Sequence, residues 1–224
     1  MILGSILLAF GIDAWWDGAQ EQRDERMALE RLDAEFAALD SVLETWQAGQ
    51  EGVALASEVL LGHTVPGGSS ALSPDSVGGR RLWTLMVNWK LDPPSATLRS
   101  LEFSGQLAAF QNQALVTQIA SWRALLTDLQ ADEEVAARRV DDEFRPYLMS
   151  HVAWRTVSSL AQRRELAGAA SAFPSGFGDL LASREFENYV DRRRTDARII
   201  AGNYDVVRSG LGHIRTLISG ELGN

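Results

Sequence analysis

The 224-residue chain contains no cysteine, and among its 21 basic residues there is a single lysine, Lys90. Without cysteine there can be no disulfide, no thiol nucleophile and no cysteine-ligated metal site. A Schiff-base or phosphate-binding lysine would have to be Lys90, and no glycine-rich phosphate signature leads up to it. These absences exclude several enzyme classes, but they do not fix the cellular compartment.

Basic residues are outnumbered by acidic ones, and the formal net charge is −9. An acidic chain repels phosphate backbones, so general nucleic-acid binding is not expected. Hydrophobic residues make up 46% of the chain and charged residues 23%, which is typical of a folded domain rather than a disordered or fibrous chain. The length suffices for one large or two small domains.

Charge is missing altogether from the first 12 residues, and Asp13, Trp15, Trp16 and Asp17 follow at once. An apolar run that ends in tryptophans and then charge is typical of a helix leaving a lipid bilayer. We therefore expect residues 1–16 to form a membrane anchor. Its apolar and aromatic members are Ile2, Leu3, Ile6, Leu7, Leu8, Phe10, Ile12, Trp15 and Trp16.

The anchor is short, because sixteen helical residues cover roughly 24 Å and a full span needs about 20 residues. It is a short or thinned span, a partial insertion, or a helix inside which the numbering begins. A cleaved signal peptide would have a basic region and a small-residue cleavage site, but the first basic residue is Arg23. A buried core helix is a further alternative. It is less favoured, because the apolar run continues into a long polar helix with no helix-breaking residue between them.

Three long segments carry apolar residues at alternating spacings of three and four, which predicts helices with heptad seams. The first seam is Leu29, Leu32, Phe36, Leu39, Leu43 and Trp46, extended by Val53, Ala56 and Leu60. The second is Leu115, Ile119, Trp122, Leu126, Leu129, Glu133, Ala136 and Val140. The third is Phe186, Val190, Arg193, Ala197, Ile200, Tyr204, Val207, Leu211, Ile214 and Ile218. No long stretch alternates with period two, so we expect an all-α fold. In it residues 17–224 form an antiparallel bundle of three long helices with small helices at one end.

Glycine, proline and capping residues divide the bundle region. Gly49 and Gly52 are expected to weaken or kink the first helix, and residues 62–79 are expected to form a loop. Pro146 should bend or end the second long helix. Helix starts are expected at Ser73, Asp92, Asn112 and Ser183.

The net charge is concentrated in the first long helix. Residues 13–61 hold 12 acidic and three basic residues, while the rest of the chain is balanced at 18 of each. This segment is either a solvated helix face or an acidic strip that orients a basic partner. Asp33, Asp40 and Glu44 lie off the first seam and are the candidate partner contacts on it.

No constellation of residues indicates catalysis. The histidines are far apart, and no Glu-x-x-His pair suggests a carboxylate-bridged iron site. The run of three arginines at 192–194 is either a solvated turn, with Arg193 reaching out of the seam, or an anchor to the acidic helix or a partner. Arg192 and Arg194 are therefore further candidate partner contacts. We expect no catalytic residue, no metal and no cofactor.

Several segments resemble an uncharacterised bacterial family of small single-pass, N-terminally membrane-anchored helical proteins. They are residues 5–17 (SILLAFGIDAWWD), 30–36 (ERLDAEF), 97–107 (TLRSLEFSGQL) and 112–122. The resemblance implies an anchored helical domain and carries over no catalytic residue. Family members usually have a longer, often basic region before the apolar stretch, which is missing here, and Gly11 replaces a polar residue. That basic region implies a cytoplasmic N-terminus and a bundle outside the cytoplasm.

Together these features favour a non-catalytic accessory or scaffold subunit. It would be held in the bacterial inner membrane by one span, with its bundle on the periplasmic side. Its partners would be membrane lipid and the subunits of a larger membrane complex of respiratory, transport or photosynthetic reaction-centre or antenna type. The alternative is a membrane-tethered extracytoplasmic sensor or ligand-binding module, and an enzyme is the least favoured class.

Overall fold

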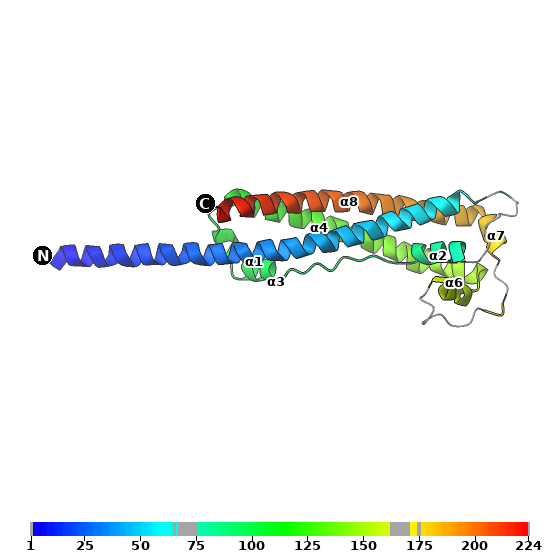
Figure 1. The fold of residues 1–224 in the computed structure, drawn as a ribbon, viewed down its shortest axis with the longest axis horizontal. Helices are drawn as coiled ribbons and strands as arrows, with labels where there is room; N and C mark the ends of the chain where they lie inside the picture. Colours follow the sequence, from blue (N-terminus) through cyan, green and yellow to red (C-terminus); the bar gives the residue numbers. More distant parts are fainter. Residues whose placement is uncertain (1, 65, 67–75, 162–170, 174–175, 224) are drawn as a thin grey trace. The chain divides into compact units, whose positions relative to one another are not determined.

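The structure is a computed structural model that describes residues 2–64, 66, 76–161, 171–173 and 176–223. Regular structure in these ranges is helical throughout, which confirms the all-α prediction. The long helices are α1 (Ile2–Leu61), α4 (Gln113–Arg139) and α8 (Arg184–Leu222) (Figure 1). The short elements are α2 (Ser76–Leu85), α3 (Ala96–Phe103), the 3-10 turn η1 (Leu107–Ala109), the π-helical segment η2 (Val140–Phe144), α5 (Arg145–His151), α6 (Trp154–Ala161) and α7 (Phe177–Leu181).

The chain folds into two compact units, and each long helix contributes residues to both. Unit 1 comprises Met1–Val42, Asp92–Ala124 and Val207–Asn224, and unit 2 comprises Leu43–Leu91 and Leu125–Val206. The segment that joins α1 to α4 places α2 in unit 2 and α3 in unit 1. The short helices are therefore divided between the two units.

In unit 1, α8 runs antiparallel to α1. Arg215 of α8 donates to Asp33 of α1 at 3.0 Å, and Arg208 donates to Asp40 at the same distance. Residue numbers thus rise along α1 as they fall along α8, as expected for neighbours in an antiparallel bundle.

The α1 and α4 helices run in the same direction, which the sequence does not predict. In unit 1, Phe36 of α1 meets Trp122 of α4 edge to face, with ring centroids 5.5 Å apart. Nearer the start of both helices, Glu25 of α1 accepts the N–H of Gln111 at 2.9 Å. The bundle is not wholly antiparallel, because the chain runs back through α2 and α3 before α4 begins.

The three predicted seams form the cores of the two units. The indole of Trp122 is fully buried, and its Nε1 donates to the carbonyl oxygen of Val207 at 2.9 Å. Trp46 and Leu126 are half-buried at the edge. Burying one large apolar side chain contributes about 1.5–3 kcal/mol, so these seams supply most of the favourable free energy. The buried seam residues are Leu29, Leu32, Phe36, Leu39, Leu43, Val53, Ala56, Leu60, Leu115, Ile119, Trp122, Leu129, Glu133, Ala136, Val140, Phe186, Val190, Arg193, Ala197, Ile200, Tyr204, Val207, Leu211, Ile214 and Ile218.

Several helix ends follow the predicted caps. Asn112 accepts the N–H of Leu115 at 3.0 Å and caps α4, and α1 ends at Leu61. Gly105 adopts a φ of 74° just after α3, a conformation that glycine reaches without strain. The predicted start at Ser73 lies outside the described residues, and α2 begins at Ser76.

Pro146 does not end the helix that contains it. The chain passes from α4 through the π-helical turn η2 directly into α5, in which Pro146 occupies the first turn. Proline lacks an N–H, and its ring crowds the carbonyl four residues earlier. A π-helical turn widens the helix at that point and accommodates the ring.

Gly49 and Gly52 lie inside α1, which continues through both positions as one helix. Gly49 makes room for an aromatic ring, because a Cβ atom there would lie 2.5 Å from Cε2 of Trp89. The Trp89 ring in turn contacts Trp46 edge to face, with centroids 5.6 Å apart. A Cβ atom at Gly52 would meet nothing within 4 Å.

We predict opposite effects for alanine at these two glycines. Gly49→Ala should destabilise unit 2 by about 1–3 kcal/mol, because Trp89 must move away from α1. Gly52→Ala is the matched control and should stabilise the helix by about 0.5–1 kcal/mol. The measurement is the urea midpoint of the full chain in detergent, followed by circular dichroism. Equal shifts for the two variants would mean that Trp89 does not rest on Gly49.

Candidate functional site

The start of α1 lies far beyond the other helices of unit 1. At the end of α8, the carbonyl oxygen of Leu222 accepts a hydrogen bond from Arg26 at 2.8 Å. Gln111, just before α4, donates to Glu25. The C-terminal end of α8 and the N-terminal end of α4 therefore lie beside Glu25 and Arg26 of α1. Because α1 begins at Ile2, about 23 residues or roughly 35 Å of it extend past this level (Figure 1).

This extension contains the residues of the predicted anchor. Trp15 is 69% exposed and Trp16 is 60% exposed. In the part of the chain that the structure describes, no helix has a segment long and apolar enough to span a membrane. The other predicted anchor residues lie in the first turns of α1, and their side chains lie outside the described residues: Ile2, Leu3, Ile6, Leu7, Leu8, Phe10 and Ile12.

The acidic strip of α1 is largely engaged within unit 1. The carboxylates of Asp33 and Asp40 hold Arg215 and Arg208 of α8, and all four side chains are partly exposed. The side chain of Glu44 is exposed. Two of the three candidate partner contacts on this strip thus also join α1 to α8.

Glu35 caps another helix from a distance. Its carboxylate accepts the N–H of Thr97 at 2.7 Å and that of Leu98 at 3.1 Å, in the first turn of α3. Ser95, at the N-cap position, makes no side-chain capping bond. The first N–H groups of a helix have no partner within the helix and favour negative charge. The carboxylate of α1 therefore replaces the missing local cap and fixes α3 against α1.

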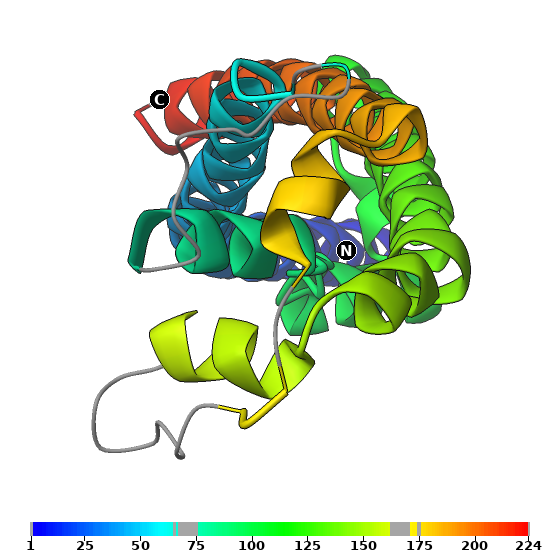
Figure 2. The same ribbon diagram turned by 90° about the vertical axis from the view of Figure 1, so that its right-hand side faces the viewer.

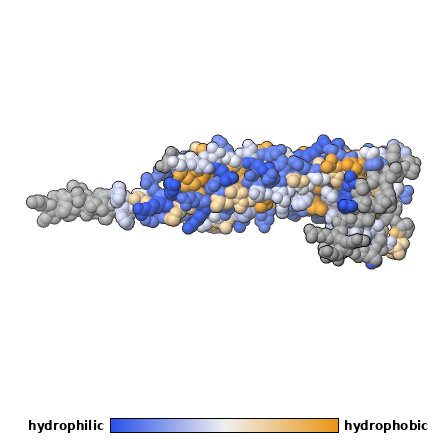
Figure 3. Space-filling model, in the orientation of Figure 1, coloured by the Kyte–Doolittle hydropathy of each residue, from blue (hydrophilic) through white to orange (hydrophobic). Residues whose placement is uncertain are grey.

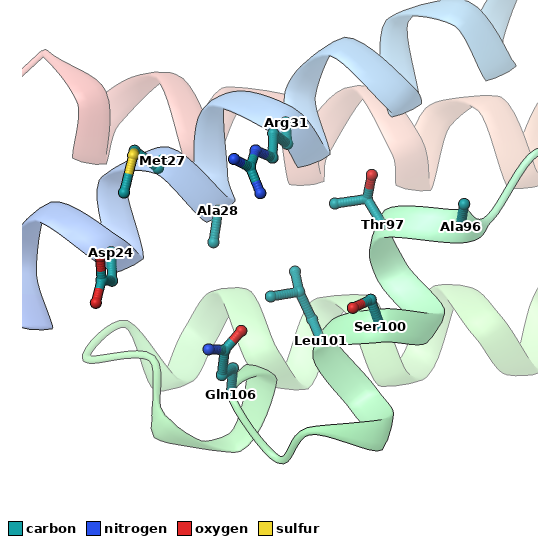
Figure 4. Close-up of a pocket in the computed structure, with 9 residues that line it drawn as sticks. All are labelled: Asp24, Met27, Ala28, Arg31, Ala96, Thr97, Ser100, Leu101 and Gln106. Atoms are coloured by element: carbon teal, nitrogen blue, oxygen red, sulfur yellow. The ribbon is translucent and has the colours of Figure 1, made fainter.

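Two adjoining grooves lie between α1 and the α3–η1 segment, and Figure 4 draws the larger of them. The larger has a volume of about 420 Å³ and the smaller about 340 Å³, and both are lined by Asp24, Ala28 and Gln106. Figure 4 shows the side chain of Arg31 between α1 and α3, near Thr97. The larger groove is also lined by Met27, Arg31, Ala96, Thr97, Ser100 and Leu101, and the smaller by Glu21, Glu25, Ala109, Phe110 and Gln111.

The three arginines at 192–194 have separate roles in unit 2. Arg192 pairs with Glu143 at 2.9 Å, and Arg194 pairs with Asp191 at 2.5 Å. Arg193 is buried and donates to two backbone carbonyl oxygens at the C-terminal end of α2, those of Leu85, its last residue, at 3.0 Å and of Val87, just after it, at 2.8 Å. Burial lowers the pKa of Arg193 to about 10. Neither predicted role fits Arg193, which instead neutralises the carbonyl end of a helix.

Residues 86–91, which we call the strap, follow α2 without regular structure, and side chains of four helices hold them. The carbonyl oxygen of Met86 accepts a bond from Arg145 of α5, and that of Lys90 accepts one from Trp46 of α1. The carbonyl of Leu91 accepts a bond from Gln130 of α4. With the bonds of Arg193 from α8, the strap connects all three long helices within unit 2.

Glu133 of α4 is the buried residue whose role sequence reasoning missed. It is 3% exposed, and it accepts the Tyr204 hydroxyl at 2.5 Å and the N–H of Leu91 at 2.8 Å. Burial raises the pKa of Glu133, and burial beside this carboxylate raises the pKa of Tyr204. A glutamate within an otherwise apolar seam was the available signal.

The histidines do not come together with other ligands. His151 contacts the Tyr147 carbonyl oxygen at 2.8 Å and the Ser150 hydroxyl at 2.9 Å, while His63 is half-buried and His213 is exposed. Across the described ranges, no group of three or more histidine, aspartate or glutamate side chains could hold a metal ion.

Comparison of the chain with family models, with curated proteins and with solved structures gives no match.

We predict that Glu133 makes stability depend on pH. A carboxyl group whose pKa is higher in the folded than in the unfolded chain favours folding while it is protonated. The folded state should therefore lose stability as pH rises from the unfolded pKa, near 4.5, through the raised pKa. Glu133→Gln removes this loss. The urea midpoint of the variant minus that of the parent should therefore increase as the pH is raised from 4.5 to 8. A constant difference between the two proteins across this range would contradict the assignment.

Glu133→Ala provides the contrast. It leaves the N–H of Leu91 and the hydroxyl of Tyr204 without an acceptor and opens a cavity. The expected loss relative to the parent is about 2–4 kcal/mol near pH 4.5 and becomes smaller as pH rises, measured by the same urea titrations. If Glu133→Ala were as stable as Glu133→Gln, the bonds of this carboxylate would not hold the strap.

Proposed function

We propose that the protein is a non-catalytic, membrane-anchored accessory subunit that docks on a larger membrane protein complex. The observation that carries the proposal is the extension of α1, which runs about 23 residues past the ends of α4 and α8. Within a bundle, an apolar helix is stabilised by its neighbours. The first part of the extension, residues 2–12, is uncharged, and an uncharged helical segment without neighbouring helices suits a lipid environment.

The arrangement of residues along α1 supports this role. The uncharged residues 2–12 come first, the exposed Trp15 and Trp16 follow, and the charged residues begin around them. Tryptophan side chains favour the boundary between lipid and water. The helix then continues without interruption into unit 1, so the proposed anchor and unit 1 share one helix.

The proposed location is the bacterial inner membrane, crossed once, with the bundle on the periplasmic side. The proposed partners are lipid and the subunits of a respiratory, transport or photosynthetic complex. The family resemblance of residues 5–17 and 30–36 supports an anchored helical domain. The remaining acidic residues near the start of the bundle favour a partner with basic groups and disfavour anionic lipid.

We predict that deleting residues 2–16 releases the protein from membranes. The truncated chain should move to the supernatant after ultracentrifugation, because the apolar segment is gone. A matched control replaces residues 2–16 with an unrelated apolar helix and should restore sedimentation. Continued sedimentation of the deletion variant after a high-salt wash would show that another surface attaches the protein.

Docking on a complex is tested by extraction in a mild detergent. The full chain should migrate in native electrophoresis with a larger assembly at a fixed stoichiometry. A chain that migrates alone would refute the accessory role and favour the tethered sensor. The control with the unrelated apolar helix separates the two functions of the N-terminus, since it keeps the membrane attachment while changing its sequence.

A further inference from the structure

We infer that the two adjoining grooves between α1 and α3–η1, here called the α1–α3 groove, bind a basic, partly apolar peptide segment of the host complex. This inference rests on the proposed accessory role and names the chemistry of the partner at one surface. It is carried by the shape of the groove, by its charge and by its position on α1.

The α1–α3 groove offers apolar surface inside a polar rim. Met27, Ala28 and Leu101 line it, and Met27 is 46% exposed. Phe103, at the end of α3 and three residues before Gln106, is 93% exposed. Figure 3 shows apolar residues reaching the surface among hydrophilic ones on the face that it draws. An exposed apolar surface bordered by polar residues is typical of a site that binds a partner.

The charge of the α1–α3 groove indicates the sign of its partner. Glu21, Asp24 and Glu25 line it, against the single cation Arg31. Glu25 receives one backbone N–H, from Gln111, and Asp24 receives one amide N–H, from Gln20, at 3.2 Å. Neither bond supplies a positive charge. Lysine or arginine side chains of a partner would complement these carboxylates.

Four carboxylates farther along α1 have partners within unit 1. Asp33 and Asp40 pair with arginines of α8, Glu30 pairs with Arg26 on α1 itself, and Glu35 caps α3. The carboxylates that line the groove are thus the ones placed to meet basic groups of a partner.

The position of the groove suits a partner at a membrane surface. Asp24 follows Trp16 by eight residues, which corresponds to about 12 Å along the helix. If the tryptophans mark the boundary of the lipid, a segment in the groove lies just outside the headgroups. Basic loops of membrane proteins occur at this depth, whereas anionic headgroups would be repelled.

The test uses the full chain in nanodiscs of phosphatidylcholine, with ¹³C-methyl groups on its four methionines. Met27 lines the groove, and Met149, which is 57% exposed in unit 2, is the internal reference. The probes are two eight-residue peptides, one alternating leucine with lysine and one alternating leucine with glutamate. The lysine peptide should shift the Met27 signal in a saturable way, while the glutamate peptide leaves it unchanged and Met149 responds to neither.

The variant Glu21→Gln/Asp24→Asn should raise the Kd of the lysine peptide about fivefold to tenfold. The control Asp128→Asn/Asp142→Asn changes the net charge equally, at two exposed side chains of unit 2, and should alter the Kd less than twofold. Equal effects of the two variants, or equal binding of the two peptides, would overturn the inference. A Met27 shift caused by anionic lipid in the absence of peptide would also overturn it, because the groove would then be a headgroup site.

A photo-crosslinking residue at Gln106 tests the same surface in cells. The expected adduct joins Gln106 to a lysine- or arginine-rich segment of a complex subunit, and Glu21→Gln/Asp24→Asn abolishes it. An adduct to lipid alone, or to a second copy of this chain, would contradict the inference. If the chain co-migrates with a complex while Met27 ignores the lysine peptide, the groove assignment fails and the accessory role stands. If the lysine peptide binds but the chain migrates alone, the accessory role fails.

Discussion

Unit 2 depends on a stretch of backbone that has no secondary structure of its own. A buried backbone carbonyl or N–H that lacks a partner is costly, so an irregular segment among helices needs side chains to satisfy it. At one end of the strap, Arg193 and Arg145 donate to backbone carbonyl oxygens. At the other end, Trp46 and Gln130 donate to carbonyl oxygens and Glu133 accepts a backbone N–H. The same bonds that satisfy the strap fix α1, α4, α5 and α8 around it. Figure 2 shows the ribbons of the long helices end on. Two charged residues, Glu133 and Arg193, are thereby retained among the buried residues of unit 2.

In unit 1, a comparable part is played by the carboxylates of α1. Glu35 supplies the cap that α3 lacks, while Asp33 and Asp40 bind α8. The acidic face predicted from the sequence is thus mainly a means of assembling the bundle. Its first part, from Glu21 to Glu25, lines a groove in which three carboxylates meet one arginine, Arg31. If that groove binds a basic segment as proposed, one charged face serves both assembly of the bundle and recognition of a partner.

The sequence predicts the long helices well, because their seams repeat over many heptads and local caps such as Asn112 agree with them. The sequence does not predict contacts between residues that lie far apart in the chain. The spacing of Gly49 suggests a weak point, and only the fold places Trp89 above it. Arg193 and Glu133 are charged residues at seam positions that are otherwise mostly apolar. The neighbouring sequence does not show that both of them bond to the backbone at the two ends of the strap. The acidic strip is visible in the sequence, but which of its members meet α3, α8 or a groove depends on register between distant helices.

The continuity of α1 has a consequence for the geometry of attachment. A continuous helix fixes both the distance and the rotation angle between two of its residues, because each residue adds about 1.5 Å and about 100°. The direction in which the α1–α3 groove points is therefore tied to the direction in which Trp15 and Trp16 point, through the residues that separate them. The number of residues between Trp16 and the groove therefore sets the direction of the groove around the helix axis. Seven added residues would leave that direction nearly unchanged and move the groove about 10 Å farther along the axis, while one added residue would rotate it by about 100°. If α1 anchors the chain as proposed, the number of residues between Trp16 and Asp24 would set the side of the helix on which a partner binds.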